Sequence, residues 1–357
     1  MRMLVTGGYG FMGSNFIRYL FTERKFDGFI VNYDKLTYAA NPLNLCDIEK
    51  KFSKRYCFVR GDICDYKKLK EIFNEYAIDT VVHFAAESHV DRSIYGPGDF
   101  IKTNISGTFI LLEVVRYFKS KGRNIRFHHI STDEVYGSLG PKGYFYETTC
   151  YSPRSPYSAS KASSDHLVRA YFHTYDIPIT ITNSSNNYGP YQFPEKLIPL
   201  MILNAVEGKK LPIYGDGMNV RDWIYVLDHA SAVYLVLEKG RIGETYNIGG
   251  ECEKKNIDVV NKICDILERI YPSSKNPLMR AIKYSDLITF VKDRPAHDRR
   301  YAMNCDKIKN ELGWQRKYRF EKGLEITVKW YLNNKKWVDS VKSGEYRKWI
   351  EKNYSWR

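Results

Sequence analysis

Short apolar segments alternate with longer amphipathic segments along the first half of the chain. The apolar segments are rich in β-branched and aromatic residues, which is typical of buried strands; they are MLVTGG, FIVNYD, YCFVRGDI, TVVHFAA and IRFHHIST. The intervening segments carry apolar residues at helical spacing; they are SNFIRYLFTER, DYKKLKEIFNEY and FIKTNISGTFILLEVVRYFKSKG. This alternation predicts an α/β fold of the Rossmann type, with a doubly wound parallel sheet covered by helices on both faces.

The pattern changes after residue 187. Before it, a helix is expected over residues 157–175, followed by the strand PITITNSS. The next segment, NYGPYQFPEKLIP, is rich in proline, glycine and aromatic residues, which favours a substrate loop that opens a second lobe. RDWIYVLDHASAVYLVLEKG then predicts a strand and a helix, and the C-terminal third shows only short helices.

These changes divide the chain into two expected lobes. The first is a dinucleotide-binding Rossmann domain over residues 1–187, with a return segment at about 221–249. The second is a smaller, mixed C-terminal lobe over residues 188–220 and 250–357, and it ends in a basic, helical tail.

Composition narrows the classes of protein. The chain of 357 residues is 43% hydrophobic and 27% charged, which is ordinary for a soluble globular protein. No apolar run reaches the roughly 18 residues of a membrane span, and the N-terminus leads directly into a strand. The seven cysteines include no C-x-x-C pair, which favours a reducing compartment. We therefore expect a cytoplasmic protein without a membrane partner.

The net charge of +14 is compatible with a nucleic-acid partner, but the lysines are scattered and mixed with acids. We expect no such partner; an anionic small substrate or a lysine-rich composition explains the surplus. None of the eight histidines has the spacing of a metal site, so no metal is predicted. His83, in TVVHFAA, is interpreted as a core histidine.

The segment TGGYGFMG predicts a phosphate-binding loop. It places Gly7, Gly10 and Gly13 directly after the first strand and before the helix SNFIRYLF. The first two glycines would let the backbone turn tightly and approach a pyrophosphate, and the third would let the helix pack close to the sheet. The diphosphate would then lie at the helix N-terminus.

Acidic residues follow at the ends of the second and third strands. Asp34 lies about twenty residues after the loop, where a carboxylate can hold an adenosine ribose diol. Since Asp34 would repel a 2′-phosphate, NAD is favoured over NADP, although the cationic Lys35 beside it weakens this preference. Asp62 is a candidate adenine contact, or simply an aspartate in a turn that ends the strand.

Tyr157 and Lys161 lie one helical turn apart in SPYSASKASSDHL. A free tyrosine has a pKa near 10 and is a poor base at neutral pH. A lysine ammonium and a positively charged nicotinamide ring nearby would favour the phenolate, so Tyr157 becomes a candidate proton acceptor. Lys161 could also hold the nicotinamide ribose.

Two adjacent acids, Asp133 and Glu134, follow the strand that ends in HHIST. In a continuing strand they would point to opposite faces. Both can face one cleft only if the strand ends by Thr132 and the chain turns there. In a poorly solvated cleft the pair resists double ionisation, so one pKa rises while the other stays low.

The chain resembles the extended short-chain dehydrogenase/reductase family, on five segments: TGGYGFMGS, AAESHVDRS, STDEVYG, YSASKA and NNYGPYQFPEKLIP. More narrowly it is similar to the nucleoside-diphosphate-glucose 4,6-dehydratases, which act on dTDP-glucose or UDP-glucose. The resemblance extends to about Trp314. It implies bound NAD, a nucleotide-sugar substrate, a 6-deoxysugar pathway such as that of rhamnose, and a homodimer. The dimer would form through a four-helix bundle that pairs the helices at about 100–120 and 157–175 of each subunit.

The same resemblance implies a set of roles. Tyr157 would take the proton of the sugar 4-hydroxyl, and Thr132 would bind that oxygen. Glu134 would remove the proton on carbon 5, and Asp133 would protonate the hydroxyl that leaves carbon 6. The remaining expected NAD contacts are Phe11, Met12, Ile63, Ala85, Thr103 and Asn187. The remaining expected substrate contacts are Ser88, His89, Asn186, Lys196, Leu197, Pro212, Tyr214, Arg221, Asn256, Arg294 and His297, with both arginines at the diphosphate.

Two other functions stay open. One is a nucleotide-sugar 4-epimerase or decarboxylase on the same scaffold, against which the pair of acids argues. The other is a non-enzymatic NAD-binding regulator, against which Thr132, Tyr157 and Lys161 argue. Thymine and uracil differ by one methyl group and cannot be distinguished on single residues; DRPAHDRRY and VRDWIYV favour the dTDP-type enzymes.

Overall fold

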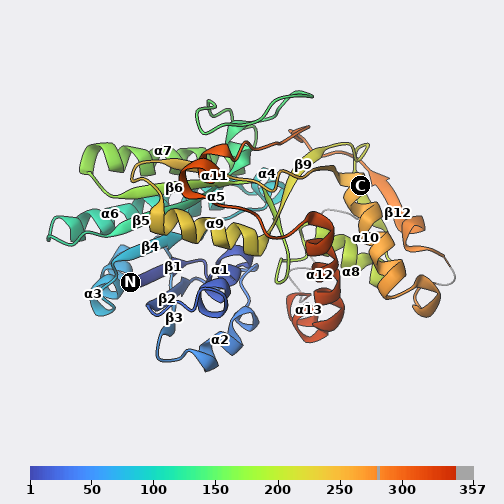
Figure 1. Cartoon of the computed structure of the whole chain (residues 1–357), viewed down its shortest axis with the longest axis horizontal. Helices are drawn as coiled ribbons and strands as arrows, with labels where there is room; N and C mark the ends of the chain where they lie inside the picture. The colour runs from blue at the N-terminus through green and yellow to red at the C-terminus, as the bar shows by residue number, and fades with distance from the viewer. Residues whose placement is uncertain (280–281, 343–357) are drawn as a thin grey trace.

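The computed structural model describes residues 1–279 and 282–342. Its centre is a seven-stranded sheet in which every neighbouring pair of strands runs parallel (Figure 1). From one edge to the other, the strands are β10 (Thr245–Ile248), β6 (Ile179–Ser184), β5 (Arg126–Thr132), β4 (Thr80–His83), β1 (Arg2–Thr6), β2 (Phe29–Asp34) and β3 (Tyr56–Arg60). Successive strands extend the sheet to one side of β1 through β2 and β3 and then to the other side from β4 onward, which confirms the predicted Rossmann-type fold.

Helices cover both faces of this sheet because its strands are apolar on both sides. Met3 and Val5 of β1 belong to one hydrophobic cluster, and Leu4 belongs to another on the opposite face. The first cluster includes residues of α1 (Phe11–Thr22), α9 (Val226–Lys239) and α11 (Asp306–Leu312). The second includes residues of α3 (Tyr66–Glu75), α6 (Thr108–Lys119) and α7 (Pro156–Tyr175).

A second lobe lies beside the sheet, at the right of Figure 1, with a hydrophobic core of its own. Its small sheets are formed by β7 (Asn186–Tyr188), β9 (Val220–Tyr225) and β11 (Glu253–Lys255), and by β8 (Leu211–Tyr214) with β12 (Ile288–Val291). Its helices are α8 (Leu197–Val206), α10 (Asn256–Ile270), α12 (Phe320–Asn333) and α13 (Lys335–Val341). The part of the predicted helical tail after residue 342 lies outside the described residues.

Short elements connect the larger ones. They are the α-helices α2 (Cys46–Lys51), α4 (Val90–Tyr95) and α5 (Pro97–Phe100), the π-helix η2 (Ile101–Gly107), and the 3₁₀ helices η1 (Pro42–Asn44), η3 (Asp133–Tyr136), η4 (Ser273–Lys275) and η5 (Tyr284–Leu287).

The predicted return segment, residues 221–249, contributes one strand to the three-stranded sheet and one to the seven-stranded sheet. Its first strand, β9, pairs with β7 and β11, whereas β10 extends the large sheet beside β6 and α9 packs against α1. The expected boundaries of the two lobes remain a prediction.

The structure differs from the sequence-based expectation at two places. The single helix expected at about residues 100–122 is divided into α5, η2 and α6. In η2, the Asn104 amide is bonded to both the N–H and the carbonyl of Glu87, each at 2.9 Å, so this turn is held to a neighbouring loop. The C-terminal third holds more than short helices, because α10 and α12 have 15 and 14 residues.

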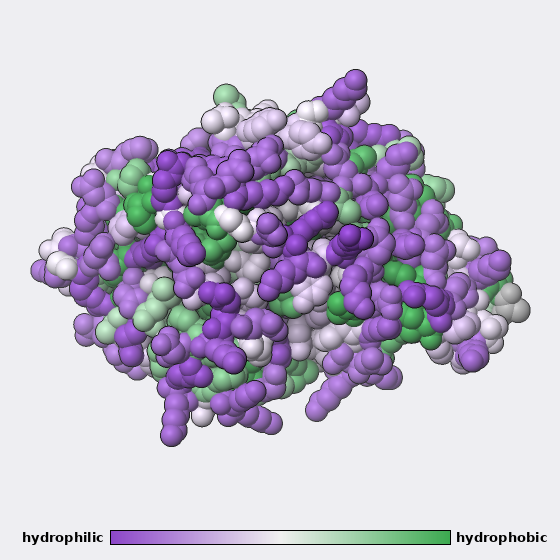
Figure 2. Space-filling view, in the orientation of Figure 1, coloured by the Kyte–Doolittle hydropathy of each residue, from purple (hydrophilic) through white to green (hydrophobic). Residues whose placement is uncertain are grey.

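None of the described helices is both long and apolar enough to cross a membrane. On the face seen in Figure 2, polar side chains predominate and apolar ones reach the surface in small groups.

Helix α7 begins with a complete capping box. The Ser155 side chain accepts from the Ser158 N–H at 3.0 Å, and the Ser158 hydroxyl accepts from the Ser155 N–H at 2.9 Å. Such reciprocal bonds satisfy backbone donors that a helix start leaves without partners. Because Tyr157 lies in the first turn of this helix, the cap also fixes the position of a candidate catalytic residue.

We predict that Ser155→Ala lowers the free energy of unfolding by about 1 kcal/mol, because one helix donor loses its acceptor. Ser163→Ala on the same helix is the matched control. Its hydroxyl only bonds back to the Ala159 carbonyl, an interaction that does not stabilise helices. Urea unfolding followed by circular dichroism measures both variants, and equal losses would contradict the assigned cap.

Candidate active site

A cavity of about 470 Å³ opens where the large sheet meets the second lobe. Its wall is built by residues at or just beyond the carboxyl ends of β1, β2, β4, β5 and β6, which is the ligand-binding edge of an open parallel sheet. All the expected NAD contacts lie on this wall: Gly7, Gly10, Phe11, Met12, Gly13, Asp34, Lys35, Asp62, Ile63, Ala85, Thr103, Tyr157, Lys161 and Asn187. Also on it are Thr132, Asp133 and Glu134, together with Ser88, Asn186 and Lys196.

The glycine loop approaches the sheet too closely for larger side chains. Gly7 has a φ of +70°, and a Cβ there would lie 2.7 Å from the Ala85 nitrogen. Gly10 is the N-cap of α1 and offers no side-chain cap, so the first N–H groups of the helix have no side-chain acceptor there. A cradle of backbone donors with no acidic residue in the first turn suits a diphosphate.

Asp34 ends β2 as a buried acceptor. Its carboxylate accepts the N–H groups of Tyr9 at 2.9 Å and Leu36 at 2.8 Å. Burial raises the pKa of Asp34, and these two bonds oppose the increase. Lys35 is paired with Asp62 at 2.8 Å, so the charge that weakened the preference for NAD over NADP is compensated.

The chain turns at the end of β5, as the acid pair requires. The strand ends at Thr132, and Asp133 and Glu134 begin the 3₁₀ helix η3. The Thr132 hydroxyl accepts from the Glu134 N–H at 3.3 Å and donates to Asp133 Oδ1 at 3.1 Å. Both acids therefore reach the same cavity, and the prediction that the strand ends by Thr132 is confirmed.

The two carboxyl groups have unlike surroundings. Burial and the neighbouring Glu134 raise the pKa of Asp133 well above its ordinary value. Burial also raises the pKa of Glu134, but the cations Arg294, Lys196 and Arg221 all oppose this increase. Around Asp133, Arg221 and Thr132 lower the pKa, whereas Glu134 and Asp222 raise it. Asp133 is thus the better holder of a shared proton.

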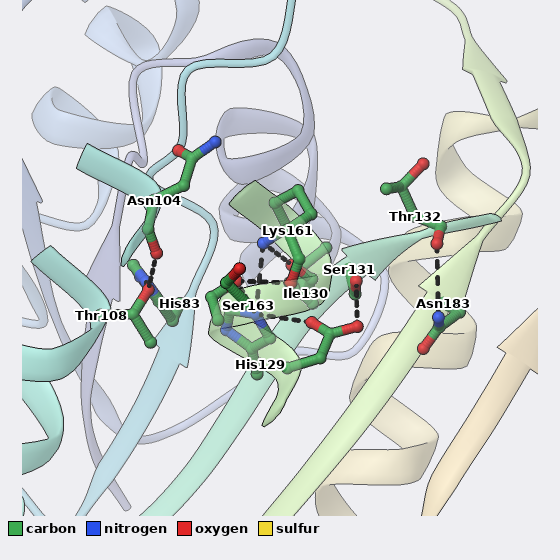
Figure 3. A network of polar contacts seen from close by, with 12 residues as sticks. His83, Asn104, Thr108, His129, Ile130, Ser131, Thr132, Lys161, Ser163 and Asn183 are labelled. Atoms are coloured by element: carbon green, nitrogen blue, oxygen red, sulfur yellow. Dashed lines mark hydrogen bonds and ion pairs between the residues drawn. The ribbon is translucent and has the colours of Figure 1, made fainter. Parts of the chain in front are cut away.

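Tyr157 and Lys161 have different surroundings although they lie on one face of α7. The pKa of Tyr157 is raised, mainly by burial and by Glu134, while the Thr132 hydroxyl opposes this increase. The Lys161 ammonium donates to the Ile130 carbonyl at 2.8 Å and lies 3.2 Å from His129 Nε2 (Figure 3). Helical spacing placed both residues on one face of α7, but it could not predict that the ammonium turns toward β5.

The remaining expected substrate contacts lie outside the cavity wall; they are His89, Leu197, Pro212, Tyr214, Arg221, Asn256, Arg294 and His297. Several of them meet around Asp91, which accepts from the Tyr214 hydroxyl at 2.8 Å and pairs with Arg294 at 3.4 Å. The rings of Tyr214 and His297 are in edge contact at 6.1 Å. This cluster also acts on the acid pair, because the positive charge of Arg294 lowers the pKa of Glu134.

Other expected contacts are held by the protein itself. Arg221 donates to the carbonyls of Val220 and Asp298, each at 2.9 Å. Its guanidinium lies over the Tyr301 ring at 4.3 Å. His89 Nδ1 faces the Arg92 N–H, and Lys196 Nζ donates to the Ser88 carbonyl at 2.9 Å. Arg221 lowers the pKa of both acids, and part of its hydrogen-bonding capacity is already used by these carbonyls.

Some residues of the site were not anticipated. Glu195 lies on the cavity wall, buried, and receives bonds from Tyr38 and Arg92 at 3.1 Å each. Asp298 accepts from the Tyr301 hydroxyl at 2.6 Å and so holds the ring over which the Arg221 guanidinium lies. The only signal for Glu195 was its place before Lys196 in PEKLIP. The signal for Asp91 and Asp298 was their place within AAESHVDRS and DRPAHDRRY.

The cavity wall carries polar atoms that lack partners. Among the described residues, these buried oxygens have no hydrogen bond: Asp133 Oδ2, Ser185 Oγ, Asn186 Oδ1, Asn187 Oδ1 and Gln192 Oε1. Buried polar atoms are normally paired, so this cluster indicates a polar ligand.

His83 lies in the core, as expected. Its ring bridges Thr6 at 2.7 Å and Thr108 at 3.0 Å. No group of His, Cys, Asp and Glu able to hold a metal ion is found in the described part of the chain.

Comparison with known proteins gives the family. Residues 4–327 match a family model described as GDP-mannose 4,6 dehydratase. The chain belongs to this family. A dTDP-glucose 4,6-dehydratase of Escherichia coli is 55% identical over 371 residues, covering 100% of both chains. That of Haemophilus influenzae is 56% identical, covering 94% of this chain and 98% of its own.

Solved structures agree. A dTDP-glucose 4,6-dehydratase from Bacillus anthracis, in complex with NAD, superposes with a TM-score of 0.84 at 47% identity, covering 96% of this chain and 100% of that one. The enzyme of the same name from Streptomyces venezuelae gives 0.87 at 43%, with the same coverage. A UDP-glucose 4-epimerase from Thermotoga maritima gives 0.80 at 27%, covering 93% and 99%. The fold is thus shared with epimerases, while the higher identities are to dehydratases.

We predict that Asp133→Asn stabilises the fold at neutral pH. A carboxyl whose pKa is raised in the native state costs stability as pH rises from about 4, where a free aspartate titrates, through its native pKa. The neutral amide removes that cost. The gain in unfolding free energy should therefore vanish below about pH 4 and grow toward pH 7. Urea unfolding at a series of pH values measures it. The control is Asp27→Asn, at an exposed loop carboxylate; the same pH-dependent gain there would contradict the assignment.

Proposed function

We propose that the chain is an NAD-dependent dTDP-glucose 4,6-dehydratase that forms the 4-keto-6-deoxy sugar. The observation that carries the proposal is the buried, adjacent pair Asp133 and Glu134 on the same cavity wall as Tyr157 and the glycine loop. Loss of water requires an acid and a base on neighbouring carbons, and this pair offers both. The 55% identity to enzymes of that name supports it.

The cavity fits NAD. Gly7, Gly10 and Gly13 with the start of α1 would hold the diphosphate, and Asp34 would hold the adenosine ribose. Asp62 and Ile63 would contact the adenine, and they line the same cavity as Thr103 and Asn187. The partnerless oxygen of Asn187 would gain a donor. Bound NAD would supply a positively charged ring that favours the Tyr157 phenolate, and a carbon that takes a hydride from the sugar and later returns it.

In the first step, Tyr157 accepts the proton of the sugar 4-hydroxyl. Thr132 holds that oxygen. It is the last residue of β5, directly before the two acids, and its hydroxyl interacts with Tyr157. Burial keeps water away from Tyr157 but also raises its pKa, so the residue becomes a base only when positive charge is brought next to it. Lys161 would hold the nicotinamide ribose.

In the second step, water leaves across carbons 5 and 6. The ketone at carbon 4 makes the proton on carbon 5 acidic, and Glu134 removes it. Asp133 gives its proton to the hydroxyl that leaves carbon 6. The unlike surroundings of the two carboxyl groups support this division, since three cations favour ionised Glu134 while burial keeps Asp133 protonated.

The second lobe would bind the nucleotide. Arg221 and Arg294 would face the diphosphate, with the buried and partnerless Arg294 Nε available as a donor. Asn186 and Asn256 each have a buried oxygen without a partner. The other proposed contacts of this part of the substrate are Ser88, His89, Lys196, Leu197, Pro212, Tyr214 and His297. We assign thymidine rather than uridine because the relatives with 55% identity act, by name, on dTDP-glucose.

We predict that Asp133→Asn and Glu134→Gln each reduce dehydration of dTDP-glucose at least about 100-fold, because general acid–base catalysis contributes that much. Chromatography of the sugar product measures the loss. In D2O, Glu134→Gln should also stop exchange of the carbon-5 proton with solvent, whereas Asp133→Asn should retain it. UDP-glucose, assayed in parallel with the unaltered protein, should be the poorer substrate. Normal dehydration by both variants would refute the assigned roles.

We further propose a homodimer formed by α6 and α7 of each subunit. The exposed apolar side chains around these helices support it; they are Tyr95, Ile101, Phe109 and Tyr175. Free cysteines at all seven positions support a cytoplasmic location.

We predict that Phe109→Glu converts the dimer into a monomer, since a charge would be buried in the helix bundle. Light scattering after size exclusion measures the mass at micromolar concentration. Phe290→Glu is the matched control: Phe290 is similarly exposed, at 57% against 44%, but lies on β12 of the other lobe. An unaltered protein with the mass of one chain would contradict the proposal.

A further inference from the structure

Helix α7 presents three ionisable groups on successive turns of one face. Tyr157, Lys161 and Asp165 are spaced by four residues each, so their side chains follow one another along the helix. The first two line the cavity, whereas Asp165 does not. Asp165 has no accessible surface at all, and the proposed reaction has no step for it. A carboxylate so deeply buried needs compensation, so its partners identify its role.

One side of Asp165 is held by hydroxyl groups. Its Oδ2 accepts from Ser131 Oγ at 2.7 Å and from the Tyr151 hydroxyl at 2.8 Å. Arg169 donates to the same Tyr151 oxygen at 2.9 Å, which fixes the ring. These bonds tie the carboxylate to β5 and to the loop before α7, so its orientation is set by the fold.

The other side of Asp165 faces the lysine. Oδ1 has no donor in hydrogen-bonding geometry, but it lies 3.2 Å from His129 Nε2. Lys161 Nζ lies 3.2 Å from the same nitrogen and donates to the Ile130 carbonyl. Figure 3 shows Lys161 of α7 close to His129 and Ser131 of β5. Carboxylate, imidazole and ammonium thus form one buried group.

We propose that Asp165 is a positioning residue for Lys161: its fixed, buried carboxylate keeps the lysine charged and holds the ammonium against β5 through His129. The assignment deepens the proposed function, since it concerns the lysine that would hold the nicotinamide ribose. The assignment can be tested without turnover, because the pairing of two buried charges also changes the free energy of unfolding.

The charges around Lys161 support this. Burial lowers the pKa of Lys161 to about 8, and Asp165 is the group that raises it. The other titratable groups that face the lysine are His129 on β5, His83 on β4, and Tyr157 on α7. Burial and Lys161 lower the pKa of His129 to about 4, burial lowers that of His83 far below its ordinary value, and the pKa of Tyr157 is raised. All three are therefore neutral at pH 7, and the compensating charge is that of Asp165.

The stability test is a double-mutant cycle on the full chain, measured as the midpoint of urea unfolding at pH 7. Asp165→Asn keeps the shape and leaves Lys161 as an uncompensated buried charge. Lys161→Met removes the buried ammonium near Asp165 and leaves Arg169, on the far side of the Tyr151 hydroxyl, as the remaining cation. The double variant Lys161→Met/Asp165→Asn should lose much less than the sum of the two single losses. Losses that simply add would overturn the proposal. If Asp165→Asn alone does not fold, the double variant must, and its failure to fold overturns the proposal equally.

Tyr151→Phe is the matched control. It removes one hydrogen bond from the same carboxylate and leaves the charge, so its loss should add to that of Lys161→Met. A cycle in which Tyr151 couples to Lys161 as strongly as Asp165 does would show packing rather than charge, and would overturn the proposal.

A second readout is the pH profile of dTDP-glucose turnover. Because Asp165 raises the pKa of Lys161, Asp165→Asn should move the alkaline limb toward lower pH by about one unit, a tenfold loss at a fixed alkaline pH. Tyr151→Phe should leave the limb in place. An unmoved limb in Asp165→Asn overturns the proposal. Complete absence of turnover in the unaltered protein would refute the proposed function instead, while the stability cycle still decides on Asp165.

Discussion

Two carboxyl groups on consecutive residues cannot both ionise easily in a cavity that excludes water, and the site depends on this constraint. Asp133 and Glu134 meet it by having unlike neighbours. Asp133 accepts only the Thr132 hydroxyl and leaves one oxygen without a partner, whereas three cations act on Glu134. A single proton therefore has a preferred place, and one cavity can offer an acid and a base together.

The fold creates this arrangement by ending strands at the same edge. The glycine loop, Asp34 and the acid pair come from three different strands, which the parallel order brings to one cavity. The cations come from elsewhere: Arg221 from β9, Lys196 from the start of α8, and Arg294 from the loop after β12. The large sheet thus supplies the cofactor site and the acids, and the second lobe supplies the charge that distinguishes them.

Buried charge is compensated along α7 in the same way. Tyr157, Lys161 and Asp165 follow one face of a capped helix, and each depends on a group from β5 or its end. Thr132 interacts with the phenol, Ile130 accepts from the ammonium, and Ser131 bonds to the carboxylate. Three adjacent residues of β5 thus contact three turns of α7, so the three groups depend on the packing of the same two elements.

Much of this protein was determined by local sequence pattern. Periodicity and residues close in the chain predict the strands and helices of the Rossmann sheet, the glycine loop, and the helical spacing of Tyr157 and Lys161. The turn after Thr132 was predicted instead from the requirement that both acids face one cleft. A π-helical turn at residues 101–107, the long helix α10 and the roles of Asp91, Glu195 and Asp298 did not follow. α10 does carry an apolar stripe that could have been recognised.

Tertiary packing alone decided the direction of the Lys161 ammonium and the cations around Glu134. Periodicity reflects which face of an element is buried. The charges that act on a residue of the cavity can lie far away in the chain, as Arg294 does from Glu134, 160 positions earlier. Such distant pairs leave no local pattern because nothing but the folded arrangement brings them together.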